Sequence, residues 1–292
     1  MRLILFNVCF FILIKQGLSQ SSEVYDFSTH FAMEVHSVDD FFDRFNFNKK
    51  SNFYKYIVNR FPDNELDRKN LIVALFNYQN KLFNPDEIKK FIFQVTDSIN
   101  PKFLKYNDKE WYAELKCKVI YKNKPSVLTL ILKVNRSKNS GYSWDIVSAK
   151  ADFLKLKPVK SDSLIMRNIK MINDSIQIRN SDYFLSPVSH GIEFTNIDNI
   201  FVNKSKINNY LYPGPRSFEL LKLAGMISKS EIIFKQVDKI RYHLLQVDNW
   251  VLVLDQFNRK EANSGWLINQ LVQIDNREKG DYKLKQLNIP KM

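Results

Sequence analysis

Cysteine is almost absent from this chain of 292 residues, which contains only Cys9 and Cys117. Cys9 lies inside an N-terminal apolar run that we expect to be removed, so the mature protein would keep one thiol. A single cysteine forms no disulfide within a chain, and a small scaffold held by disulfide bonds is therefore excluded. The fold must instead be stabilised by apolar burial, and we expect Cys117 to be a buried residue of a strand and not a nucleophile.

Glycine is also scarce, with seven in the chain, so backbone loops that cradle phosphate groups are few. The sequence contains no glycine-rich phosphate loop, no Gly-x-Ser-x-Gly turn and no paired His-Glu motif. Its four histidines, His30, His36, His190 and His243, form no cluster with metal-ligand spacing. We therefore predict no catalytic residues, no metal site and no cofactor, and the ligand-binding residues stay unknown.

Only one long apolar run occurs, and it lies at the N-terminus. It extends from Leu3 to Ile14, follows a positive residue and is succeeded by a polar segment with the small residues Gly17 and Ser19. This arrangement is typical of a secretory signal peptide, and the run is shorter than the roughly 20 residues of a spanning helix. We expect a signal peptide at residues 1–19 and a periplasmic or extracellular protein without a membrane span. An uncleaved anchor is the alternative.

Acidic residues are outnumbered by basic ones, which gives a formal net charge of +13. The charge becomes +11 once Arg2 and Lys15 leave with the signal peptide. Such an excess is compatible with nucleic acid, anionic lipid or acidic polysaccharide as a partner. The longest basic runs, however, are pairs such as Lys49-Lys50, and scattered lysines are typical of solvated surfaces. We expect no specific nucleic-acid partner, while a basic surface protein that holds polyanions stays an alternative.

Apolar residues are abundant, at 45% of the chain, and aromatic residues make up 14%, which is typical of a globular protein. In the first half, apolar residues recur at helical spacing and then, from Trp111, alternate with polar residues. Ser37 and Asn84 are expected helix N-caps, with Pro85 at the first helical position. The predicted helices cover residues 38–45, 66–76 and 84–95, and the predicted strands cover 111–119, 127–134 and 144–151.

The second half repeats this order of helices and strands. Four residues recur at a constant offset of 159: Glu34, Val38, Asp39 and Phe42 correspond to Glu193, Ile197, Asp198 and Phe201. A turn with Asn-Ser-Gly also comes shortly before both Trp144 and Trp266. Such repeats indicate duplicated structural units. In this half we predict a helix over 217–227 and strands over 231–234, 239–246, 250–257 and 266–274.

The predicted fold class is α+β, with two tandem units, each having N-terminal helices packed on a curved antiparallel β-sheet. The first unit covers residues 28–155, a linker covers 156–186, and the second, shorter unit covers 187–292. This plan resembles the nuclear transport factor two-like, cystatin-like cone folds. The whole chain is similar to uncharacterised exported proteins of Bacteroidetes-type bacteria. The resemblance implies sheets that curl around their helices and leave a pocket, and it implies no catalytic residues.

We expect an exported, soluble, non-catalytic binding or interaction protein whose ligand is a small molecule, a glycan or a protein. His30 and His190 occupy matching places before the repeated helix, and we interpret them as polar loop residues rather than as a paired site. The alternative function is a pocket-based hydrolase or isomerase that uses a buried carboxylate. Its candidate strand residues are Tyr112, Asp145, Tyr242, His243 and Asp255. The four tryptophans, Trp111, Trp144, Trp250 and Trp266, are expected to anchor the core.

Overall fold

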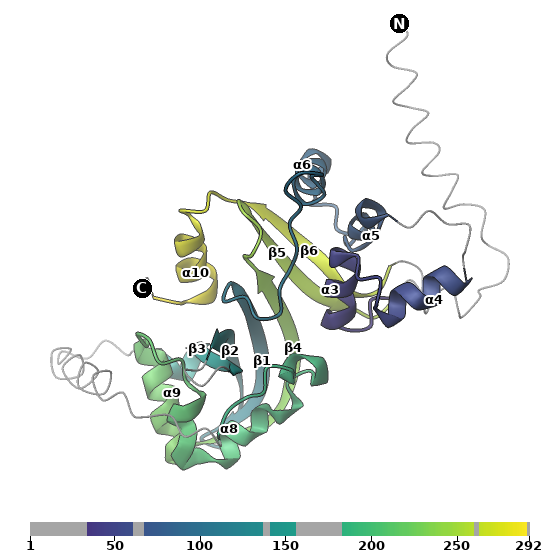
Figure 1. The fold of residues 1–292 in the computed structure, drawn as a ribbon. Helices are drawn as coiled ribbons and strands as arrows, with labels where there is room; N and C mark the ends of the chain where they lie inside the picture. Colours follow the sequence, from purple (N-terminus) through teal and green to yellow (C-terminus); the bar gives the residue numbers. More distant parts are fainter. Residues whose placement is uncertain (1–33, 61–66, 137–140, 156–182, 260–262, 291–292) are drawn as a thin grey trace, which may run out of the picture.

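The computed structural model describes residues 34–60, 67–136, 141–155, 183–259 and 263–290 (Figure 1). Its six strands form one sheet in the order β3-β2-β1-β4-β5-β6, and all neighbouring strands are antiparallel. The strands are β1 (Trp111–Tyr121), β2 (Lys124–Arg136), β3 (Tyr142–Lys150), β4 (Ile232–Leu244), β5 (Trp250–Phe257) and β6 (Gly265–Gln273). The predicted α+β class is confirmed.

The helices precede the strands in each half, as predicted, and one further helix ends the described chain. The α-helices are α3 (Val38–Asn46), α4 (Asn52–Arg60), α5 (Arg68–Ala74), α6 (Pro85–Val95), α8 (Asn199–Val202), α9 (Phe218–Ser228) and α10 (Lys279–Leu287). Short 3-10 helices are η1 (Asp152–Leu154), η2 (Ser189–Ile192), η3 (Thr195–Asp198) and η4 (Lys204–Tyr210). The predicted caps are confirmed, because Ser37 accepts from the Asp40 amide of α3 and Asn84 accepts from the Asp86 amide of α6.

The two predicted meanders join edge to edge. β1 pairs with β4 over its whole length, from Trp111 opposite Leu244 to Tyr121 opposite Ile232. Both strands are therefore central, and the two halves share one open sheet. Two separate cone-like units are not confirmed.

Helical segments of the first half attach to the last strand of the second half. The carbonyl of Val35 accepts from the Trp266 amide at 2.9 Å, and the carbonyl of Leu75 accepts from the Ile268 amide at 2.8 Å. Figure 1 shows α3, α5 and α6 beside β5 and β6 accordingly. The first half is thus tied to the second by backbone hydrogen bonds.

The second half makes the reciprocal connection to β3. The carbonyl of Leu185 accepts from the Trp144 amide at 3.0 Å, and the Tyr212 amide donates to the carbonyl of Ile146 at 2.9 Å. Helix α9 lies beside β3 in Figure 1. Each half therefore covers strands of the other, so the described chain shares one main core.

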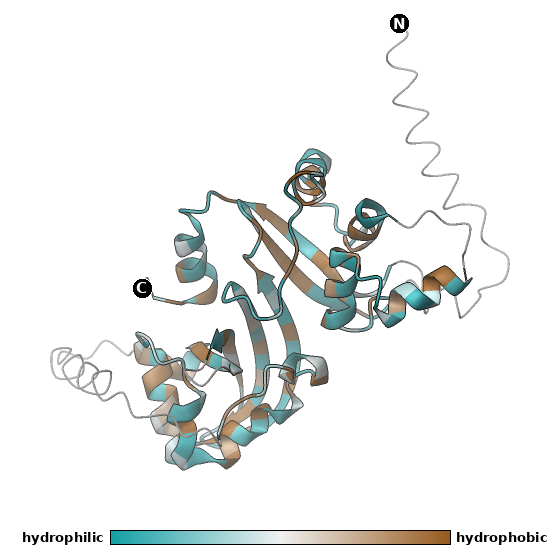
Figure 2. Ribbon diagram, in the orientation of Figure 1, coloured by the Kyte–Doolittle hydropathy of each residue, from teal (hydrophilic) through white to brown (hydrophobic). Residues whose placement is uncertain are grey.

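Each face of the sheet has its own core. The main core lies under the helices and contains all four tryptophans, none more than 2% exposed, together with the fully buried Cys117. Burial raises the pKa of the Cys117 thiol to about 12, so this cysteine is an inert packing residue, as predicted. A smaller core under α10 includes Tyr112, Val253 and Leu287. Hydrophobic and hydrophilic residues alternate along β1 and β4, where they are visible as brown and teal bands (Figure 2).

Candidate functional site

Strand β4 has an open edge along most of its length. β5 pairs with only four of its residues, Arg241 to Leu244, and then continues beside β6 alone. Residues 232–240, apart from Lys235 and Asp238, pair with β1 on one side, and the stretch has no strand on the other side in the part of the chain that the structure describes. Unpaired N–H and C=O groups along such an edge can form a ladder with another extended segment.

A groove of about 660 Å³ lies along this open edge. One side is β4 itself, from Ile232 to Ile240, and the end near Ile240 is closed by Gln256. The opposite wall comes from the segment around η3 and α8: Glu193, Thr195, Asp198, Phe201, Val202 and Lys204. Its volume falls in the range of ordinary ligand pockets, roughly 300 to 1,000 Å³.

Three contacts fix how the wall lies along β4. At one end, Gln256 donates to Glu193 at 3.5 Å. In the middle, the rings of Phe201 and Phe234 stack with their centroids 5.0 Å apart. At the other end, the Lys204 ammonium donates to the Ser230 hydroxyl at 2.9 Å. The wall therefore runs from acidic through apolar to basic, from the Ile240 end of the strand to its Ile232 end.

Two adjacent residues with a strained backbone stand where this wall begins. Glu193 and Phe194 both have φ near +53°, in the left-handed region that residues other than glycine seldom occupy. Each such residue costs on the order of 1 to 3 kcal/mol, and such strain is often found at functional sites. Phe194 is fully buried and packs edge-on against Trp144 at 5.2 Å. Packing of Phe194 thus holds the exposed Glu193 at the groove.

The sequence repeat contained a signal for this site. Glu193, Asp198 and Phe201, which carry the repeated pattern of the second half, all line the groove. Their first-half counterparts have other roles: Phe42 is fully buried, and Asp39 binds the His190 ring. The local structures differ as well: the first occurrence lies on the α-helix α3, whereas the second lies on the 3-10 helix η3 and the short helix α8 and faces the groove.

His190 is a buried residue of the 3-10 helix η2, and not the ordinary polar loop residue expected from the sequence. Its ring lies 2.9 Å from the Pro187 carbonyl through Nδ1 and 3.0 Å from the Asp39 carboxylate through Nε2. The hydrogen bond from His190 holds the pKa of Asp39 below its usual value. His30, its expected counterpart, lies outside the described residues. The part of the chain that the structure describes contains no group of three or more His, Cys, Asp or Glu residues placed to hold a metal ion.

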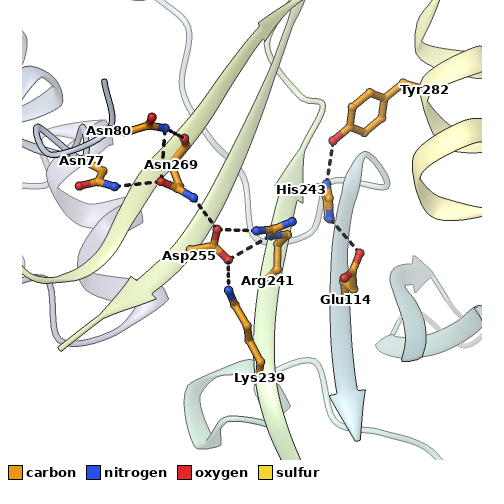
Figure 3. Close-up of polar contacts among 9 residues, drawn as sticks. All are labelled: Asn77, Asn80, Glu114, Lys239, Arg241, His243, Asp255, Asn269 and Tyr282. Carbon is orange, nitrogen blue, oxygen red and sulfur yellow. Dashed lines mark hydrogen bonds and ion pairs between the residues drawn. The ribbon is translucent and has the colours of Figure 1, made fainter. Parts of the chain in front are cut away.

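The carboxylate of Asp255 lies at the centre of a polar network on the face of the sheet that carries α10 (Figure 3). Arg241 donates two hydrogen bonds to it, at 3.0 and 2.7 Å, and Asn269 donates one at 2.8 Å. The Lys239 ammonium lies 3.3 Å away. Burial alone would raise the pKa of Asp255, but the hydrogen bonds from Arg241 and its charge outweigh burial and lower it.

His243 connects the same face to α10. Its Nδ1 lies 2.8 Å from the Tyr282 hydroxyl, and its Nε2 lies 3.6 Å from the Glu114 carboxylate (Figure 3). Burial lowers the pKa of His243, which favours the neutral ring. Burial alone would raise the pKa of Glu114, but the neighbouring His243 and the charge of Arg241 outweigh burial and lower it. These three residues connect the sheet to the helix through the buried His243.

The five candidate residues for a pocket enzyme do not meet at one place. Tyr242 lies in the main core against Trp266, whereas His243 and Asp255 lie on the opposite face. Tyr112 does lie opposite His243 in the register, in the core under α10, whereas Asp145 accepts from Asn135 at 2.6 Å and from Ser143 at 2.9 Å on β3. A general acid needs a carboxyl group with a raised pKa, whereas those of Asp255 and Glu114 are lowered.

Comparisons with known proteins add no relative: no family model, no curated protein and no solved structure matches this chain. Among the described residues, no helix has both the length and the hydropathy needed to cross a bilayer. The function must therefore be argued from the groove and its surroundings.

Proposed function

We propose that this protein is an exported, non-catalytic binding protein that holds an extended polypeptide segment in the groove beside β4. The observation that carries this proposal is the open edge of residues 232–240 within the sheet. A peptide added there forms backbone hydrogen bonds with the edge, and the groove beside it accommodates its side chains. Affinity then comes from the backbone, and selectivity comes from the wall.

Two features of β4 restrict what can pair with it. Its register with β1 shifts twice, so that Lys235 and Asp238 are extra residues without an opposite partner. Bulges and edge lysines are the means by which proteins prevent indiscriminate pairing between sheets. The same edge is bordered by the wall from Glu193 to Lys204. These features favour a single strand of suitable chemistry over the broad edge of another sheet.

The surface around the groove gives less support to a glycan. Sugars are commonly held on exposed aromatic faces, and all four tryptophans are buried. The two aromatic rings of the groove, Phe201 and Phe234, stack on each other. The groove therefore favours a peptide, because a peptide can form hydrogen bonds with the backbone groups of the open edge.

We also propose that the chain arose by duplication of one α+β unit of the cone-like kind, with export directed by residues 1–19. The reciprocal connections between the halves support the duplication. The amides of Trp144 and Trp266 each donate to a carbonyl of the other half, at Leu185 and Val35 respectively. Both tryptophans follow the repeated Asn-Ser-Gly sequence. The two tryptophans thus make similar backbone contacts to the other half, although the bridge is antiparallel at Leu185 and parallel at Val35.

A groove-filling substitution tests peptide binding. Thr195 is exposed on the wall, so Thr195→Trp fills the groove and leaves stability within about 0.5 kcal/mol. With a blocked seven-residue peptide of alternating Thr and Val as the probe, calorimetry should show binding to the wild type that is at least tenfold weaker in the variant. Asn199→Trp, on the same segment but outside the groove, should bind like the wild type.

Equal binding by the wild type and Thr195→Trp would place the peptide elsewhere and contradict the proposal. A homodimer that Thr195→Trp dissociates would assign the edge to a second copy of the chain, which also contradicts it. Light scattering on the same samples separates these two outcomes.

A further inference from the structure

The groove carries opposite charges at its two ends. Glu193 and Asp198 precede Phe201 along the wall, and Lys204 and Lys235 lie toward the beginning of β4. The lining also includes Asp238 and Lys239, whose charges are already paired with Lys118 and Asp255. Glu193 and Lys204 have hydrogen bonds to neutral side chains, to Gln256 and Ser230, but no ion pair with another described residue. Charged groups that line a groove without an opposite charge beside them favour a ligand of complementary charge.

The direction of β4 and the order of charges along the groove together predict the orientation of a bound peptide. Every neighbouring pair of strands in the sheet is antiparallel, and antiparallel ladders are slightly more stable than parallel ones. A peptide antiparallel to β4 begins at the Ile240 end, near Glu193, and ends at the Ile232 end, near Lys204. Its N-terminal part therefore meets the Glu193 carboxylate, and its C-terminal part meets the Lys204 ammonium.

We infer that the ligand is an extended peptide segment with cationic residues at its N-terminal end, apolar residues at alternate central positions and anionic residues at its C-terminal end. This inference rests on the proposed function and specifies its ligand. The open stretch of β4, residues 232–240, is at most about 30 Å long at roughly 3.3 Å per residue. A segment of about nine residues spans it. The stacked rings of Phe201 and Phe234 provide the apolar centre.

Two blocked peptides of identical composition test the direction. The forward peptide is acetyl-Lys-Lys-Thr-Val-Thr-Val-Thr-Glu-Glu-amide, and the reversed peptide exchanges its two lysines with its two glutamates. The forward peptide should bind about tenfold more tightly at low salt, which is the combined effect of several exposed ion pairs. The preference should shrink as salt is raised, because exposed charges are screened. Calorimetry at two ionic strengths measures both.

A variant with the charges exchanged gives the matched test. Asp198→Lys combined with Lys235→Glu should abolish or invert the preference, whereas Lys285→Glu on α10, outside the groove, should keep it. Equal affinities of the two peptides, or a preference for the reversed one, would overturn the inferred direction while strand addition at β4 would stand. Failure of both charged peptides and of the neutral peptide to bind would overturn the direction and the proposed function together.

Discussion

Replacing Gly265 by valine is expected to unfold the protein, with a loss of more than about 4 kcal/mol. Gly265 has φ of +82°, where a β-branched side chain is strained, and a Cβ there would overlap the backbone carbonyl of Val35. Backbone cannot move aside as a flexible side chain can, and the same segment accepts the hydrogen bond from Trp266. The free energy of unfolding in urea, followed by circular dichroism, measures the effect.

The matched control is the glycine of the first Asn-Ser-Gly sequence. A Cβ on Gly141 would meet nothing within 4 Å, so Gly141→Val should change the free energy of unfolding by about 0.5 kcal/mol or less. The contrast arises because residue 35 of the first half crosses to β6. If both substitutions were equally costly, or both harmless, the reciprocal attachment of the halves would be wrong.

Replacing Asp255 by leucine should cost about 3 kcal/mol at neutral pH. Asp255 is 2% exposed, and its removal leaves the half-buried guanidinium of Arg241 without the carboxylate that it binds through two hydrogen bonds. Losing one partner of a buried ion pair is costly because the other charge stays desolvated. The control, Asp238→Leu, breaks an exposed pair with Lys118 and should cost less than about 1 kcal/mol.

The stabilisation by Asp255 should be lost when the pH is lowered. The pKa of Asp255 is lower in the folded protein than its ordinary value of about 3.9. Its stabilising contribution is therefore complete above that ordinary value and is lost as the pH falls through the folded pKa. The difference in unfolding free energy between wild type and Asp255→Leu should be constant from pH 7 to about 5 and narrow in more acidic solution. A difference that grows on acidification would contradict the assigned ion pair.

Features determined by neighbouring residues were predictable from the sequence. The N-caps Ser37 and Asn84 bond to amides two or three residues ahead, so a short sequence contains the whole interaction. The strand beginning at Trp111 alternates between buried and more exposed residues from Ala113 to Val119, because its two faces there enter different surroundings. The α+β class follows from these local patterns.

Features that depend on distant pairing were not predictable. Nothing near β1 indicates that its second neighbour is β4, more than a hundred residues later. β4 itself was predicted as two pieces, 231–234 and 239–246, because the extra residues Lys235 and Asp238 interrupt the alternation. The open edge lies at this interruption. The two extra residues therefore concealed both the continuous strand and the groove beside it.

Hydrogen exchange along β4 tests the central claim most directly. Wild-type protein saturated with the neutral Thr-Val peptide should show slower amide exchange in residues 232–240, because the outward-facing N–H groups of the open edge become hydrogen-bonded. Residues 111–121 of β1, which is already paired on both sides, should exchange at an unchanged rate. Measured binding with no protection of residues 232–240 would contradict strand addition at β4.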